Sequence, residues 1–175
     1  VADSTGPSSY RLRESGRGNG IETYDMNEQT NYGNAVDFTD GDNYWNNANA
    51  DLDEYAGDAH WGAEMTYDYY WEKYNRNSID DNGFALLSYI HYDQDYGNAF
   101  WDGQRMTYGD GPNGNNPFTA LDICGHEVTH GLTSNTADLV YQDEPGALNE
   151  AFSDIFGESI EYFAKPGDFS WVVGE

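Results

Sequence analysis

His126-Glu127-Val128-Thr129-His130 lies in a segment, residues 120–135, whose pattern predicts a helix. Residues four apart lie on the same face of a helix, so both imidazoles can reach one tetrahedral metal ion. Glu127 is one step round the helix, close to the ion yet free to take a proton from a water molecule. The five residues therefore predict a zinc site with an adjacent general base, although this motif alone is not decisive.

A second predicted helix, residues 147–164, carries acidic side chains in matching register. When two antiparallel helices face each other, the residue numbers of each opposed pair add up to the same value. Three pairs share the sum 280: His130 with Glu150, His126 with Asp154, and Asp122 with Glu158. Glu150 is therefore expected as the third zinc ligand and Asp154 as the carboxylate partner of His126. A solvated acidic helix face is the alternative, but it does not explain two histidines in register.

The chain resembles the thermolysin-like family of zinc metallopeptidases. The resemblance is carried by residues 98–101 (NAFW), 125–131 (GHEVTHG), 139–142 (LVYQ) and 146–157 (GALNEAFSDIFG), and it extends along nearly the whole chain. It implies an α+β fold: a β-rich amino-terminal lobe with a long helix, residues 1–119, followed by the zinc-binding helices, residues 120–175. These helices would begin a mainly helical second lobe, within which we expect the chain to be truncated.

The resemblance assigns roles to the residues around the metal. The zinc ligands would be His126, His130 and Glu150. Glu127 would be the general base toward the water that zinc activates, and would then pass its proton to the leaving amine. Tyr141 would stabilise the tetrahedral oxyanion, its alternative being an aromatic residue that flanks a helix. Asp154 would orient His126, and Asn149 would do the same for His130.

The resemblance also implies residues that bind substrate. Asn98 and Ala99 match an edge strand that pairs with the backbone of an extended peptide. Phe100 and Trp101 could contact substrate or could pack within their own hairpin. The pocket for the residue after the scissile bond would be lined by Phe118 and Ile123.

Carboxylates at the far end of the two helices predict a second metal. Asp122, Glu158 and Glu161 would face one another and repel unless a cation neutralised them, and Asp168 is a fourth candidate ligand. Several hard oxygen ligands suit calcium rather than zinc. The resemblance supports one structural Ca²⁺ in addition to one catalytic Zn²⁺.

Composition excludes several classes of protein. The 175 residues include 32 Asp and Glu against 7 Lys and Arg, a formal net charge of −25. Such a chain would repel nucleic acid and anionic membranes. Aromatic residues make up 16% of it, too many for a disordered acidic tail. The single cysteine, Cys124, excludes an intrachain disulfide and is expected to be a buried small residue.

The remaining pattern predicts the other elements. Short strands are expected near residues 10–13 and 21–24, a helix at 53–74, a buried strand at 84–92 and a hairpin at 98–108. Asp102-Gly103 is a favoured two-residue turn pair for that hairpin. Residues 109–117 are expected to form the loop between the lobes. No apolar run is long enough to cross a membrane, and no signal-peptide pattern is present.

These observations favour a secreted zinc endopeptidase that cleaves extended polypeptides, by analogy before bulky apolar residues. Its signal peptide and propeptide are absent from this chain, and the propeptide would be a partner before maturation. The alternative is an inactive fragment of such an enzyme that is stabilised by its bound metal ions. It would need the carboxy-terminal part of the enzyme for activity, present as a separate chain or as a missing segment. A third possibility is an acidic, calcium- or salt-adapted structural protein whose motif is coincidental.

Overall fold

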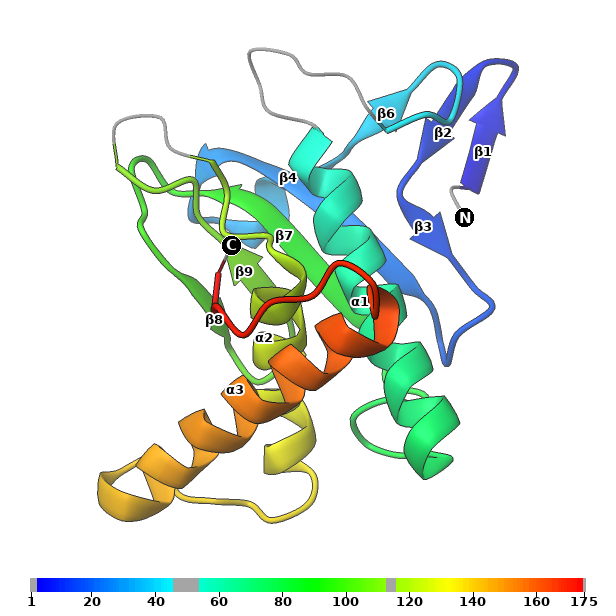
Figure 1. Ribbon diagram of the computed structural model, residues 1–175. Helices are drawn as coiled ribbons and strands as arrows, with labels where there is room; N and C mark the ends of the chain where they lie inside the picture. Colours follow the sequence, from blue (N-terminus) through cyan, green and yellow to red (C-terminus); the bar gives the residue numbers. More distant parts are fainter. Residues whose placement is uncertain (1–2, 46–53, 113–115, 175) are drawn as a thin grey trace.

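The computed structural model describes residues 3–45, 54–112 and 116–174, and shows a β-rich amino-terminal part followed by helices (Figure 1). The larger sheet has the order β3-β4-β7-β9-β8, and β5 pairs with β4 at one side of this path. Its strands are β3 (Arg13–Glu14), β4 (Ile21–Gln29), β5 (Val36–Asp37), β7 (Leu86–Tyr92), β8 (Ala99–Trp101) and β9 (Met106–Tyr108). The mixed α+β class expected from the sequence is confirmed.

Pairing within this sheet places β8 at an edge. β4 and β7 are parallel, as are β7 and β9, whereas β8 and β9 form the antiparallel hairpin that the sequence predicts. The hairpin connection is longer than the expected two-residue turn and spans residues 102–105. Asp102 Oδ1 accepts hydrogen bonds from the backbone N–H groups of Gln104 and Arg105, which stabilises the wider turn.

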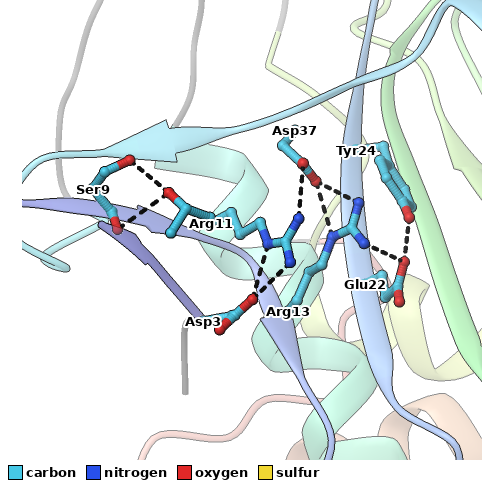
Figure 2. Close-up of polar contacts among 8 residues, drawn as sticks. Asp3, Ser9, Arg11, Arg13, Glu22, Tyr24 and Asp37 are labelled. Atoms are coloured by element: carbon cyan, nitrogen blue, oxygen red, sulfur yellow. Dashed lines mark hydrogen bonds and ion pairs between the residues drawn. The ribbon is translucent and has the colours of Figure 1, made fainter. Parts of the chain in front are cut away.

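A smaller sheet of β1 (Asp3–Gly6), β2 (Ser9–Arg11) and β6 (Thr39–Asp40) lies beside the larger one, and the short 3-10 helix η1 (Tyr32–Asn34) precedes β5. Ion pairs join the two sheets (Figure 2). Arg11 lies 2.7 Å from Asp3 and 3.5 Å from Asp37, and Arg13 lies 2.7 Å from Asp37. Asp37 thus forms ion pairs with one arginine from each sheet.

Helix α1 (Glu54–Tyr74) packs between the sheet and the later helices (Figure 1). Its buried side chains include Ala56, Ala59, Ala63, Tyr67 and Tyr70, which recur at the three- and four-residue spacing that predicted the helix. The predicted first residue, 53, lies outside the described residues. In the main core the three alanines and Tyr67 meet strand residues such as Ile21, Leu86 and Met106, whereas Tyr70 belongs to a second cluster with Leu121 and Ile160 of the later helices.

Helices α2 (Leu121–Ser134) and α3 (Asp143–Ala164) cross with their backbones in close contact. A Cβ atom on Gly157 would lie 2.5 Å from the carbonyl oxygen of Asp122, and one on Gly125 would lie 3.1 Å from Gly157 Cα. Only glycine fits at such an approach, so these two glycines bring the helices close enough for their side chains to share one site.

Helix α3 begins at Asp143, four residues before the expected start. Pro145 and Gly146 lie in its first turn. Proline is tolerated there because its missing N–H would have no intrahelical partner. Of the predicted loop at 109–117, residues 113–115 lie outside the described part. No helix in the described ranges is long and apolar enough to cross a bilayer.

Candidate metal centre

Three side chains from α2 and α3 converge at the crossing. His126 Nε2 lies 2.9 Å from His130 Nε2 and 3.2 Å from Glu150 Oε2, and His130 Nε2 lies 3.5 Å from Glu150 Oε1. Four ligands at the usual zinc bond lengths are about 3.3 Å apart in a tetrahedron. The three observed separations therefore match three corners of a zinc coordination sphere.

The other nitrogen of each imidazole is held by a side chain of α3. His126 Nδ1 lies 2.9 Å from Asp154 Oδ1, and His130 Nδ1 lies 2.8 Å from Asn149 Oδ1. Donation from Nδ1 to these oxygens leaves a lone pair on each Nε2, and the two lone pairs point into the same space. A cation between them removes the repulsion, so the donor set fits a zinc ion. Burial lowers the pKa of His130, which favours the neutral form that binds metal.

Glu127 follows His126 on α2 and is buried, with only 7% of its surface exposed. Burial raises the pKa of its carboxyl group to about 7, the nearby Glu150 charge adds to the shift, and a hydrogen bond with the backbone of Trp101 opposes it. A carboxylate with a pKa near neutrality can both accept and return a proton under physiological conditions.

Tyr141 precedes α3 and is 67% exposed. Its hydroxyl donates a hydrogen bond to the carboxylate of Glu150, and this bond, together with burial, raises the pKa of Tyr141 to about 12. The ring also contacts His130 edge-on, with centroids 5.9 Å apart. The hydroxyl therefore lies next to the candidate ligands rather than on a remote helix flank.

Comparison with known proteins agrees with this geometry. A family model described as thermolysin metallopeptidase, catalytic domain, matches residues 2–134, and one described as thermolysin metallopeptidase, alpha-helical domain, matches residues 137–175. The chain belongs to the thermolysin family of metallopeptidases. The two matches meet just after α2, whereas the division expected from the sequence, at 119/120, stays a prediction.

Relatives within the thermolysin family share almost half of the residues. Bacillolysin from Brevibacillus brevis is 45% identical over 170 residues, and thermolysin from Alicyclobacillus acidocaldarius subsp. acidocaldarius is 44% identical over 168 residues. These alignments cover 96% and 95% of this chain but 30% of each relative. The chain thus spans less than a third of the length of the relatives it matches.

A solved structure shows the same fold. The precursor of protealysin, a metalloproteinase from Serratia proteamaculans, superposes with a TM-score of 0.70 at 37% identity. The superposition covers 83% of this chain and 44% of that one.

Residues 98–101, which are expected to bind substrate, lie in and next to β8. It is the last strand of the larger sheet, as expected, with Asn98 exposed just before it and Ala99 buried. Phe100 contacts the rings of Tyr92 and Tyr96. Trp101 packs against Phe84 and lies against Gly131 of α2, so its contacts fit the packing alternative.

The other predicted site residues differ in how deeply they are buried. Phe118 and Ile123 are partly buried and pack against the main core. Three of the four candidate calcium ligands are buried on α2 and α3, namely Asp122, Glu158 and Glu161, whereas Asp168 is exposed beyond α3. Asp122 Oδ2 accepts a hydrogen bond from the backbone N–H of Gly174, at 2.5 Å.

Within the described ranges, one set of three or more metal-binding side chains has all its ligand atoms within 4.8 Å of one another: His126, His130 and Glu150. The four candidate calcium ligands form no such set, so the calcium site stays a prediction. Sequence reasoning missed Ser153, whose Oγ lies 3.2 Å from His130 Nδ1. Its place one turn after Asn149 on the same face of α3 was the available signal.

Proposed function

We propose that this protein is a zinc-dependent endopeptidase that hydrolyses peptide bonds of extended polypeptides. The observation that carries the proposal is the convergence of two imidazole nitrogens and one carboxylate at zinc-like spacing, directly beside a buried glutamate. Membership of the thermolysin family supports it.

Each residue of the centre has a chemical task in this proposal. His126, His130 and Glu150 would hold zinc, which when bound supplies a Lewis acid that activates water and polarises the scissile carbonyl. Glu127 takes a proton from the attacking water and returns it to the leaving amine, a role suited to its raised pKa. Tyr141 donates a hydrogen bond to the developing oxyanion once its hydroxyl turns from Glu150 toward the substrate.

Substrate would bind along β8. An edge strand offers unpaired backbone groups to an extended peptide, which gives affinity with little dependence on sequence. Asn98, Ala99 and Phe100 would supply this surface, and Trp101 would support it from the core side. Phe118 and Ile123 would line the pocket that favours cleavage before bulky apolar residues.

A structural calcium ion belongs to the same proposal. Three carboxylates, those of Asp122, Glu158 and Glu161, are buried near the contact of α2 with α3, and Lys165 Nζ lies 3.9 Å from Glu161 Oε1. Buried negative charge is costly, and a divalent cation would compensate it further. Asp168 would complete the site by closing the tail over it. We expect removal of Ca²⁺ to lower the melting temperature of the chain without removing zinc.

A second candidate, an inactive fragment that needs a carboxy-terminal part, is favoured by the surface of α3. Apolar side chains 39–58% exposed follow one another at helical spacing along this helix: Leu148, Phe152, Ile155 and Tyr162. Exposed stripes of this kind are normally covered by another element. Further helices of the same enzyme would cover the stripe and complete the substrate cleft.

The proposal includes secretion and maturation from a propeptide-bearing precursor. The protealysin structure is that of a precursor, which supports a propeptide as a partner of the fold. Nucleic acid and membranes are not expected partners of a chain with a net charge of −25.

Zinc stoichiometry and peptide hydrolysis test the function together. The purified chain should retain one zinc per molecule after dialysis, with and without a separately produced carboxy-terminal part of the enzyme. Glu127→Gln should keep the zinc and lose at least about 100-fold in hydrolysis. The glutamine has nearly the same shape but cannot accept the proton.

The outcomes separate the two candidates. Absence of bound zinc would overturn both. Hydrolysis by the chain alone that Glu127→Gln abolishes supports the complete enzyme. Zinc binding without hydrolysis, followed by activity when the carboxy-terminal part is added, supports the fragment.

A further inference from the structure

Ser153 occupies an unusual position in the candidate centre. It lies on α3, next to Asp154, and its side chain is completely buried. Its Oγ is 3.2 Å from His130 Nδ1, the same nitrogen that lies 2.8 Å from Asn149 Oδ1. His126 Nδ1, in contrast, faces the carboxylate of Asp154.

The two nitrogens of His130 compete for one proton. A proton on Nδ1 can be donated to Asn149 Oδ1, which can only accept, whereas the Ser153 hydroxyl can accept from Nδ1 in this tautomer or donate to it in the other. A proton on Nε2 can instead be donated to His126 Nε2, 2.9 Å away, or to the carboxylate of Glu150, 3.5 Å away. The first tautomer leaves Nε2 free to bind metal, whereas the second blocks it.

The acceptors of the two histidines differ in strength. Asp154 is a carboxylate and by itself strongly favours a proton on His126 Nδ1. Asn149 is a neutral amide and a weaker acceptor, while the opposing group, Glu150, is charged. A second hydrogen bond at His130 Nδ1, with Ser153, strengthens the hold on the ring, and burial protects these bonds from competing water.

We propose that Ser153 is a positioning residue that, together with Asn149, holds the ring of His130 with its Nε2 toward the candidate zinc position. This inference rests on the proposed zinc site and deepens it. Ser153 does not touch the ion or the substrate in this arrangement. It acts through His130 alone, so its effect must be visible in the state of that ring.

Ser153→Ala tests the inference, with Ser159→Ala as the matched control. Ser159 is on the same helix and is half-buried, but its hydroxyl donates to the backbone carbonyl of Ile155 at 2.6 Å instead of contacting a histidine. We expect Ser153→Ala to weaken zinc binding about fivefold, the effect of losing roughly one neutral hydrogen bond. Ser159→Ala should stay within twofold of the wild type. Zinc affinity is measured by competition with a chromophoric chelator.

A second readout reports the ring directly. In the zinc-free chain, ¹⁵N–¹H correlation spectra resolve the two ring nitrogens of each histidine. Ser153→Ala should shift the Nδ1 resonance of His130 and leave that of His126 in place, which a general loss of packing would not do. The melting temperature of the zinc-free variant shows that it is folded.

Failure of the inference differs from failure of the proposed function. If the wild-type chain binds no zinc, the zinc site itself is wrong. If the wild type binds zinc while Ser153→Ala keeps the same affinity and the same His130 Nδ1 resonance, the positioning role is overturned.

Discussion

At the scale of single residues, the orientation of His126 depends on the carboxylate of Asp154, which lies 2.9 Å from Nδ1. Asp154→Asn keeps an oxygen acceptor but removes the charge that favours a proton on Nδ1. We expect zinc affinity to fall about tenfold, because partners of ligating histidines have effects of that order. Competition with a chelator measures it. Glu144→Gln removes an exposed charge from the same helix and should change the affinity far less.

His60 gives the stability of the chain a specific dependence on pH. It is buried on α1, with Nδ1 2.9 Å from Thr23 Oγ1, and burial lowers its pKa from 6.5 to about 4. Glu64, 4.0 Å from Nε2, partly opposes this shift, and the charge of Arg17 adds to it.

Between pH 6.5 and pH 4 the unfolded chain binds a proton at His60 that the folded chain does not. The free energy of unfolding therefore falls as the pH falls through this window, by up to about 3 kcal/mol from this group, and is unaffected by it above the window. Chemical denaturation at several pH values should show His60→Gln losing that part of the slope. Thr23→Val removes the hydrogen bond but not the titration, so it should be less stable at every pH and keep the slope. An unchanged slope in His60→Gln would disprove the assignment.

At the scale of elements, the metal centre depends on how closely α2 and α3 approach. Gly157→Ala would place a methyl group 2.5 Å from the carbonyl oxygen of Asp122. We expect the free energy of unfolding to fall by about 1–3 kcal/mol, since overpacking outweighs the better helix propensity of alanine. Zinc affinity should fall as well, because separating the helices separates their ligands.

Gly167→Ala is the matched control for this substitution. Gly167 lies just after α3, and nothing lies within 4 Å of the position its Cβ would take. Its denaturation midpoint and zinc affinity should match those of the wild type. Equal stability of the Gly157 and Gly167 variants would show that the crossing can relax.

The register of α2 against α3 could be predicted from the sequence because side-chain spacing on a helix is regular. The expected pairs His126–Asp154 and His130–Glu150 lie 2.9 and 3.5 Å apart, which confirms the antiparallel alignment. Ser153 was missed although it lies one turn after Asn149. The spacing of the residues places a segment of α3 against His130, but it does not tell which of two neighbouring side chains, Ser153 or Asp154, contacts that ring.

Other features depended on tertiary contacts that a sequence pattern does not contain. The inward packing of Trp101 follows from the space left by Gly131 on a helix thirty residues later. The wide hairpin turn follows from side-chain bonds of Asp102, which compete with the tight turn favoured by Asp-Gly. The packing of Trp101 and the shape of the turn therefore depend on the groups that surround them in the fold, and not on local conformational propensity.

At the scale of the whole molecule, the balance of charge is uneven. Of the seven Lys and Arg residues, three are engaged near the amino-terminal sheets, where Arg11, Arg13 and Arg17 each contact at least two carboxylates. Seven cations cannot neutralise 32 acidic residues, so a large excess of negative charge remains. Folding brings these charges together, and their mutual repulsion destabilises the compact state.

Salt should therefore stabilise this chain, as expected for a protein adapted to a saline medium. Raising NaCl from about 0.01 M to 1 M shortens the screening length from about 30 Å to 3 Å, which weakens long-range repulsion more than the short arginine ion pairs. We expect the melting temperature to rise by at least about 2–4 °C, corresponding to about 1 kcal/mol. A variant with three exposed acids neutralised, Glu28→Gln, Glu72→Gln and Asp138→Asn, should be more stable than the wild type at low salt and respond less to NaCl. A melting temperature that is unchanged or lowered by salt would contradict the repulsion argument, because the same acidic surface would then be stabilised by contacts that salt weakens.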